Sequence, residues 1–342
     1  MISVVIPLYN KQDYISRAIK SVANQLYTDW ELIIIDDQSL DGSVDEVKKF
    51  ISDNNFNIKL FHQKNAGQSA ARNFGIDRSC GDIIAFLDAD DEWHPDFLHT
   101  IHALFKLFPS AGMFGTGWRK IFYPKFICKN KWHMDVTVSD NDGAESFIVN
   151  DYFKKSLVAP ICWVGSTAVR ADVAREMNGF KIGEHMGGDR DFWGRIALKY
   201  NLAYSSKILG IYRTDSDKRE NSRSDRKLQS PPFINEGQNF LKNKTNVDKE
   251  KNLMIKMYIN SLYLNYFLKS IRAGKSKIIY NLLKENLIIN KDISVYLLII
   301  SFYVTPIKIT QFILKILSHN LFSKKNVFKY NVKVNTYKAK KI

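Results

Sequence analysis

Cysteine is scarce in this sequence: only three of its 342 residues are cysteines, namely Cys80, Cys128 and Cys162. They have no paired spacing, so neither a zinc site nor a disulfide framework is predicted, and a reducing compartment fits best. The sequence opens on the apolar Ile2–Ile6 without a charged segment or cleavage site, which argues against a secretory signal. The strongly apolar Ile293–Thr305 has thirteen residues, whereas about 20 are needed to span a bilayer.

Charge is distributed unevenly along the chain. Residues 1–210 carry 24 Lys and Arg against 26 Asp and Glu, a net charge of −2, and residues 211–342 carry 26 against 9, a net charge of +17. Such asymmetry suggests two functions joined in one chain. A basic third usually faces phospholipid or nucleic acid. Because no nucleic-acid-binding motif accompanies it, we predict no nucleic-acid partner.

Short apolar runs alternate with helical patterns in the first part of the chain. Strands are predicted at 2–6, 32–35, 58–61 and 83–87, and helices at 14–22, 44–51 and 70–78. Asp13 and Ser43 are expected to cap the first two helices. Repeated β-α-β units with apolar strands predict an α/β fold with a mostly parallel central sheet flanked by helices. Ligands of such sheets bind beyond the carboxyl ends of the strands.

Acidic residues follow two of these strands. Asp88, Asp90 and Asp91 come after the fourth, where three carboxylates repel one another unless a divalent cation lies beside them. The alternative is an acidic turn in which Asp91 caps a helix. Asp36 and Asp37 end the second strand, where a carboxylate can accept hydrogen bonds from a nucleobase or ribose. An Asx turn leading to the cap at Ser43 is the competing interpretation.

Two glycine-containing segments add further candidates. In Asn65–Asn73, Gly67 permits close backbone approach at a helix start that favours anions. Arg72 could neutralise phosphate there, or it could be an ordinary exposed helical arginine. In 187–193, flexible glycines precede Asp189 and Asp191 at the start of a helix predicted to run to Tyr200. A carboxylate here could act as a general base, but we expect Asp191 to cap the helix.

The order of these stretches resembles that of a family 2 glycosyltransferase with the GT-A fold. The resemblance extends from residue 1 to about 215, roughly 60% of the chain. It is carried by these stretches: Ser3–Asn10, Glu31–Ser43, Asn65–Gly75, Gly81–Asp91 and Gly187–Trp193.

The resemblance implies a donor site and a catalytic base. It implies that Tyr9 flanks the nucleobase, that Asp37 binds its edge and that Asp88 and Asp90 form the DxD motif. Asp90 is then the direct ligand of Mn²⁺ or Mg²⁺. The family's acidic pair before the helix reads Gly188-Asp189 here, so Asp189 is assigned as the base and Asp191 as the second candidate. Other residues assigned to donor binding are Pro7, Gly67 and Arg72.

The implied reaction is transfer of a sugar, with inversion, from a nucleoside diphosphate to an acceptor hydroxyl. A UDP-sugar is the default donor, with dTDP- and GDP-sugars as alternatives, and a glycan or lipid-linked acceptor in polysaccharide or lipopolysaccharide biosynthesis is expected. Nucleotidyltransferases usually open with a Gly-rich, Arg-containing loop, which Pro7–Asn10 is not. Many relatives carry a His after the late Tyr-Arg pair. Here Tyr212-Arg213 is followed by Thr214 and Asp215. Asp215 could replace a metal-binding His, but a solvated acidic loop is the preferred interpretation.

The domain organisation is predicted as a catalytic domain over 1–217, a polar linker over 218–252 and a basic, apolar helical extension over 253–342. Helices are expected at 253–271 and 278–289, and an interfacial stretch at 293–317 in which Lys308 and Lys315 interrupt the apolar pattern. Basic residues beside apolar faces suit an anionic inner leaflet. We therefore predict a cytoplasmic protein held peripherally at the inner face of the membrane. A subdomain packed on the catalytic domain, or on a second copy in a homo-oligomer, is the alternative.

Overall fold

The computed structural model describes residues 1–123, 132–139, 143–157, 160–183, 187–216, 233–243, 249–272 and 334–336. The chain divides into two units. The first comprises Met1–Tyr263 with Val332–Ile342, and the second comprises Leu264–Asn331. The description of the second unit is confined to the end of one helix, so the predicted segments 278–289 and 293–317 lie outside the described residues. No helix in the described ranges is long and apolar enough to cross a membrane.

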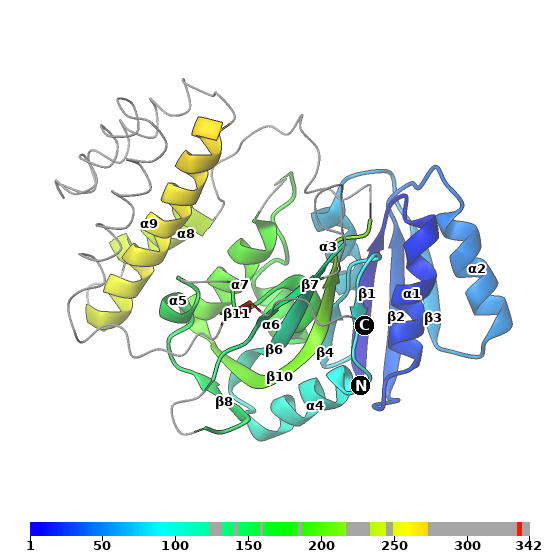
Figure 1. The fold of residues 1–342 in the computed structure, drawn as a ribbon, viewed down its shortest axis with the longest axis horizontal. Helices are drawn as coiled ribbons and strands as arrows, with labels where there is room; N and C mark the ends of the chain where they lie inside the picture. The colour runs from blue at the N-terminus through cyan, green and yellow to red at the C-terminus, as the bar shows by residue number, and fades with distance from the viewer. Residues whose placement is uncertain are drawn as a thin grey trace. The chain divides into compact units, whose positions relative to one another are not determined.

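One large sheet organises the first unit (Figure 1). Its main path runs through β11 (Val334–Thr336), β7 (Trp132–Val136), β6 (Ala111–Phe122), β9 (Thr167–Arg170), β4 (Ile83–Phe86), β1 (Ile2–Leu8), β2 (Trp30–Asp36) and β3 (Ile58–His62). Beside this path, β10 (Asn201–Arg213) pairs with β6, β5 (Glu92–Trp93) and β8 (Ser146–Val149).

The sheet is mixed, so the prediction of a mostly parallel sheet is correct only for part of it. Strands β4, β1, β2 and β3 are parallel neighbours, because a helix after each of β1, β2 and β3 returns the chain to the same end of the sheet before the next strand. Beyond β4, strand β9 runs antiparallel to both β4 and β6. The last long strand, β10, is parallel to β6 and antiparallel to β5 and β8.

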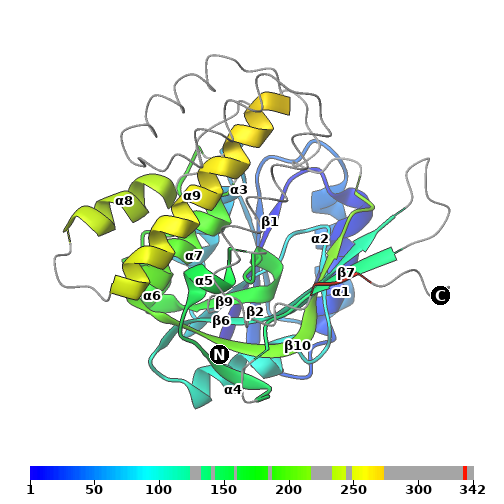
Figure 2. The same cartoon turned by 60° about the vertical axis from the view of Figure 1, so that its left-hand side comes forward.

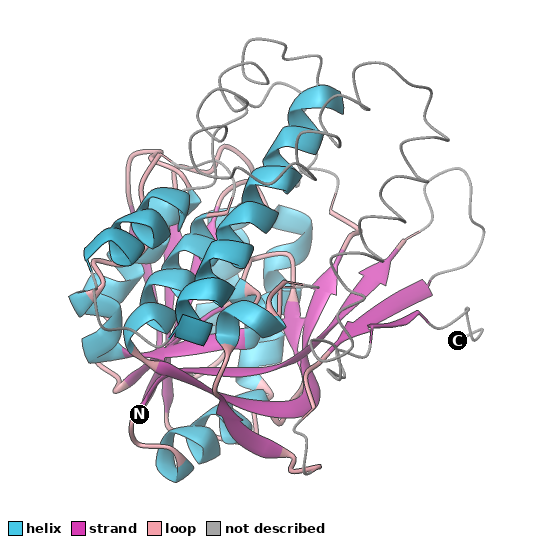
Figure 3. Cartoon of the chain, turned by 90° about the vertical axis from the view of Figure 1, so that its left-hand side faces the viewer, coloured by secondary structure: helices cyan, strands magenta, loops and turns pink. Residues whose placement is uncertain are grey.

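Helices cover the sheet on both faces, as the sequence predicts (Figure 3). They are α1 (Gln12–Ala23), α2 (Ser43–Asp53), α3 (Gln68–Arg78), α4 (Phe97–Leu107), α5 (Tyr152–Lys155), α6 (Ala171–Glu176), α7 (Gly188–Lys199), α8 (Phe233–Asn243) and α9 (Lys249–Arg272). Lys11 and Gly42 occupy the N-cap positions of α1 and α2. The predicted caps Asp13 and Ser43 are therefore wrong, because both residues lie within the first turn.

Successive side chains of each strand point to opposite faces of the sheet, which explains why helices can pack on both faces. In β2, Leu32 and Ile34 pack in the cluster that contains α1 and α4, whereas Ile33 and Ile35 pack against α3. All four are buried, so the run reads as continuously apolar. Helix α3 approaches β1 closely at Gly75, where an added Cβ would lie 2.3 Å from a methyl carbon of Val5.

The segment predicted as a polar linker contains packed structure. Residues 233–243 form α8, and Phe233 lies fully buried on Gly194 of α7, where an added Cβ would lie 2.4 Å from the phenyl ring. Helix α9 begins at Lys249 and contributes these buried residues to the same core: Met254, Ile255, Tyr258, Ile259 and Leu262. Figure 2 shows α8 and α9 beside α7. The predicted linker over 218–252 is therefore wrong for residues 233–243 and 249–252, which are helical, whereas the helix predicted at 253–271 lies within α9.

Candidate functional site

A cleft of about 520 Å³ lies at the carboxyl ends of the parallel strands. Its first wall is formed by the loops after β1, β2 and β4 and by the start of α3. The predicted site residues Pro7, Tyr9, Asp37, Gly67, Arg72, Asp88, Asp90 and Asp189 all line the cleft. The structure thus brings together residues far apart in sequence, as the strand-end rule predicts. Asp191 is fully buried and does not line it.

Asn10 joins the loops after β1 and β2. Its backbone N–H donates to Ser39 Oγ at 3.1 Å, and its side-chain oxygen accepts from the Leu40 N–H at 2.7 Å. The φ of Asn10 is 51°, in the left-handed region that Asn tolerates better than most residues. These contacts fix the rim next to Tyr9, which lines the cleft.

Asp36 and Asp37 have different roles at the end of β2. Asp36 accepts from the Ser39 N–H at 3.0 Å, which is the Asx turn that the sequence suggests. The Asp37 carboxylate reaches across to the loop before α3. It accepts from Gln63 at 2.7 Å and from the backbone N–H groups of Ala66 and Gly67 at 2.8 and 2.9 Å. Asp37 therefore positions the loop that carries Gly67, whose φ of 90° requires glycine.

Arg72 is buried, so its interpretation as an exposed helical arginine is wrong. Its guanidinium donates to Asp88 at 2.6 Å and lies 5.2 Å from the centre of the Phe180 ring. Gln68 also donates to Asp88, at 3.0 Å. One carboxylate of the DxD pair is thus held by a cation from the start of α3.

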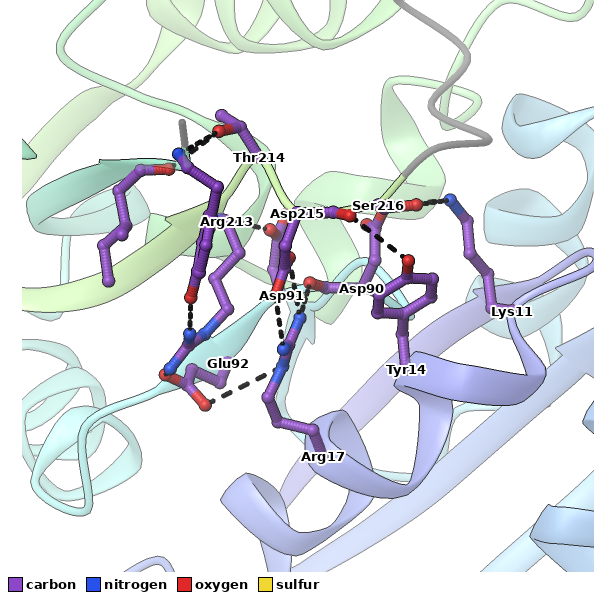
Figure 4. A network of polar contacts seen from close by, with 12 residues as sticks. Lys11, Tyr14, Arg17, Asp90, Asp91, Glu92, Arg213, Thr214, Asp215 and Ser216 are labelled. Atoms are coloured by element: carbon purple, nitrogen blue, oxygen red, sulfur yellow. Dashed lines mark hydrogen bonds and ion pairs between the residues drawn. The ribbon is translucent and has the colours of Figure 1, made fainter. Parts of the chain in front are cut away.

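Asp90 contacts a cation from a different element (Figure 4). The ammonium of Lys11 lies 2.8 Å from its carboxylate and also donates to Ser216 Oγ at 2.8 Å. Arg17 donates to the backbone carbonyl of Asp90 at 2.7 Å. Lys11 lines the cleft but was not predicted from the sequence. Its position directly after the strand-end stretch Pro7–Asn10 could have indicated that it lies there.

Two neighbouring acids are engaged within the protein rather than solvated. Asp215 pairs with Arg17 at 2.8 Å, so the predicted solvated loop is wrong at this residue. Asp91 is fully buried and accepts from the backbone N–H of Arg213 at 2.7 Å. It does not cap a helix, because the next long helix, α4, has Asp96 at its N-cap. These contacts tie the end of β10 to the DxD loop (Figure 4).

Asp189 lines the cleft, whereas Asp191 is buried in the core. Helix α7 begins after Gly187, which has the left-handed φ of 81°, so Asp191 lies in the first turn and is not the cap. Its carboxylate pairs with Arg195 at 2.8 Å and with Lys181 at 3.5 Å, with no exposed surface. Asp189 lies on the cleft side, and its carboxylate accepts from the Arg190 N–H at 2.9 Å.

Apart from Asp189, the residues of the second wall of the cleft were not predicted from the sequence. It comes from β6, β10, the segment before the 3₁₀ turn Val164–Ser166 and the start of α7, and it includes Trp118, Lys120, Trp163, Asp189, Arg190 and Tyr212. Trp118 and Lys120 are two residues apart on a strand and share a face, a signal that requires knowing β6. Cys162 also lines this side, where burial raises the pKa of its thiol to about 12 and keeps it protonated at neutral pH.

Residues 3–177, just over half of the chain, match the family model described as glycosyl transferase family 2. The chain therefore belongs to glycosyl transferase family 2, which confirms the family that its sequence resembles. It is 45% identical over 100 residues to the uncharacterized glycosyltransferase YibD of Escherichia coli, covering 29% of each chain. It is 38% identical over 98 residues to the putative teichuronic acid biosynthesis glycosyltransferase TuaG of Bacillus subtilis, covering 29% of this chain and 39% of TuaG. These matches span less than half the length of either relative.

Solved structures agree on the fold. The structure of S. aureus TarS residues 1–349 with UDP-GlcNAc superposes with a TM-score of 0.62 at 18% identity, covering 83% of this chain and 80% of that one. The mannosyltransferase PcManGT of Pyrobaculum calidifontis, in complex with GDP-Man and Mn²⁺, gives a TM-score of 0.54 at 14% identity, covering 95% and 88%. Likeness at this identity confirms the predicted GT-A fold.

Proposed function

We propose that this protein transfers a sugar from a nucleoside-diphosphate donor, a UDP-sugar by default, to a hydroxyl of a glycan or lipid-linked acceptor. The setting would be cell-surface polysaccharide or lipopolysaccharide biosynthesis. The observation that carries the proposal is the cleft, which gathers Tyr9, Asp37, Arg72, Asp90 and Asp189 from five separate elements. The name of TuaG supports the polysaccharide setting. The UDP-GlcNAc and GDP-Man complexes of the similar structures support a nucleotide-sugar donor.

The first wall suits a nucleoside diphosphate. A carboxylate has about four lone-pair sites, and Asp37 uses three of them within the protein. The remaining site is available to the edge of a base placed beside Tyr9. The start of α3, with Gln68 and Ser69 on the cleft, offers the positive end of a helix to the phosphates.

A divalent cation fits this wall in one particular way. Within the described ranges, no cluster of three or more His, Cys, Asp or Glu residues could enclose a metal ion. Mg²⁺, however, is commonly held by one or two carboxylates together with substrate phosphates and water. Asp90 would hold it, with Asp88 nearby and restrained by Arg72. When bound, such an ion neutralises the charge of the diphosphate leaving group.

Asp189 is the proposed general base. It lines the cleft at the start of α7, whereas Asp191 is committed to its pair with Arg195. Its carboxylate would take the proton of the acceptor hydroxyl, whose oxygen attacks the anomeric carbon on the face opposite the diphosphate. The C–O bond to the diphosphate breaks as the new C–O bond forms, so the configuration inverts.

The test is a panel of nucleotide sugars incubated with the purified protein, with and without Mn²⁺. We expect release of one nucleoside diphosphate, increased by the metal and by a saccharide acceptor. Calorimetry with UDP provides an independent readout of the donor site. If no nucleotide binds and none is released from any donor, the proposed function is wrong.

We also propose that the C-terminal extension holds the protein at the inner face of the membrane. Its support is the net charge of +17 in residues 211–342. Each basic residue near an anionic leaflet contributes about 1 kcal/mol, screened by salt. Full-length protein should sediment with anionic vesicles, be partly released by high salt and ignore neutral vesicles. Equal sedimentation with both, or with neither, would contradict this attachment.

A further inference from the structure

The two walls of the cleft differ in charge and in chemistry. On the first wall, Asp37, Asp88 and Asp90 stand against the two cations Lys11 and Arg72. On the second wall, among the described residues, Asp189 is the one carboxylate and stands against Lys120 and Arg190. The first wall is thus formally negative and suits a metal with a diphosphate. The second is formally positive at the place where the acceptor hydroxyl must reach Asp189.

Aromatic rings make up much of the second wall. Trp163 lies 5.7 Å from Trp118 and 5.1 Å from Tyr212 between ring centroids, and its plane is perpendicular to that of Tyr212. The buried indole N–H of Trp118 has no acceptor in the described part of the chain. Aromatic faces with a few polar groups suit a ligand with apolar C–H faces and hydroxyl edges. A sugar ring has that chemistry.

Two cations border these rings. The ammonium of Lys120 lies 5.1 Å from the centroid of Tyr212, and the two residues are paired partners on neighbouring strands. Arg190 follows Asp189 on α7 and also lines the cleft. A planar guanidinium and an ammonium that line the same cleft as the carboxylate base can receive an oxyanion of a ligand bound there.

We propose that the second wall is a subsite for an anionic acceptor saccharide, one that carries a phosphate or carboxylate group. The sugar ring packs on Trp118, Trp163 and Tyr212, and Lys120 with Arg190 receives the oxyanion. This inference rests on the proposed function, because it concerns the acceptor of that same reaction. It adds the acceptor's charge and the residues that select it.

The experiment measures binding to the full-length protein preloaded with UDP, following its tryptophan fluorescence. Three probes are compared: a glycerol-phosphate oligomer, a glucuronic-acid oligosaccharide and a neutral maltooligosaccharide. We expect one or both anionic probes to bind at least about tenfold more tightly than the neutral one, with an affinity that falls as salt rises. The first two probes distinguish phosphate from carboxylate as the source of the oxyanion.

Variants identify the residues responsible. Lys120→Gln and Arg190→Gln should each weaken binding of the anionic probe about tenfold, the loss of one charge-assisted contact, and Lys120→Arg should restore most of it. Lys106→Gln is the matched control, since Lys106 also lies over a ring, that of Phe105, but is exposed on α4 away from the cleft. Tyr212→Leu should weaken every saccharide that binds.

The outcomes separate this inference from the proposed function. If UDP itself does not bind, the proposed function fails. If UDP binds but neither anionic probe binds better than the neutral one, the subsite is refuted and the donor site stands. An equal loss of UDP and saccharide affinity in Lys120→Gln would place Lys120 on the donor and also overturn the inference.

Discussion

The two walls of the cleft are built by different kinds of chain path. The first wall uses loops that follow β1, β2 and β4, parallel strands whose carboxyl ends share an edge. The second wall uses the last part of β6, the end of β10 and a segment before a 3₁₀ turn, and long-range strand pairing brings β6 and β10 together. Short motifs after strands can therefore be recognised in sequence, whereas a wall assembled from the bodies of distant strands cannot.

The largest effect should come from the first wall. Asp90→Ala is expected to abolish transfer together with Mn²⁺-dependent UDP binding, because it removes the carboxylate proposed to hold the ion. Calorimetry with UDP, with and without Mn²⁺, measures this, and circular dichroism checks that the fold is intact. Unchanged metal-dependent binding would remove Asp90 from the site.

Asp189→Asn tests the second wall. Donor binding should persist while turnover falls by roughly 10²–10⁴-fold, the usual contribution of a general base. Steady-state release of nucleoside diphosphate in the presence of acceptor gives the rate. Near-normal turnover here, with a collapse in Asp191→Asn at normal stability, would reverse the assignment of the two residues.

The stability of the Asp191→Asn variant also tests whether Asp191 is a buried structural residue and Asp189 the base. Asp191 is fully buried against Arg195, and breaking such a pair costs about 3 kcal/mol or more, beyond the roughly 1 kcal/mol expected for a lost cap. Urea unfolding of the first unit's core, followed by tryptophan fluorescence, provides the measurement. Lys199→Gln, a substitution on the same helix as Asp191 that breaks an exposed pair with Glu176 of α6, is the control and should cost little.

The smallest predicted effect concerns Lys11. Its ammonium contacts the Asp90 carboxylate at 2.8 Å, so it competes with any cation at that oxygen. Lys11→Gln should tighten Mn²⁺ binding in the absence of nucleotide by about tenfold, since nearby like charges repel. Electron paramagnetic resonance of free Mn²⁺ reports this directly. Weaker binding in the variant would mean that Lys11 supports the cation site instead of competing for it.

Some site residues and elements could be predicted from the sequence, and others could not. The strands and helices of the first part of the chain were predictable because their apolar patterns are undisturbed, and so were the strand-end residues Asp37, Asp88 and Asp90. The buried position of Asp191 could not be predicted. An Asp near the start of a helix can either cap it or lie in its first turn, and the sequence does not distinguish the two until the first helical residue, Gly188, is known. Trp118 and Lys120 carried no local motif, and their partners on β10, Gly210 and Tyr212, lie more than 90 residues further along the chain.

Helix α8 illustrates a second limit. Its surroundings in sequence are polar and charged, which favoured a linker, yet Phe233 and Ile234 are buried, and Phe240 and Leu241 pack against the same core. Two buried side chains in an otherwise polar stretch leave little trace in composition. Local averages therefore underestimate short helices that dock by a few residues.

That docking has a practical consequence for building chimaeric enzymes. The helix that carries Asp189 rests, through Gly194, on Phe233, and Gly237 of α8 in turn faces Ile259 of α9, where an added Cβ would lie 2.8 Å from that side chain. A junction placed after the last long strand, near residue 217, would remove the support under the proposed base. Exchanging acceptor or membrane-directing parts between relatives should therefore keep α8 and the buried residues of α9 with the catalytic part, together with residues 332–342, which belong to the same unit.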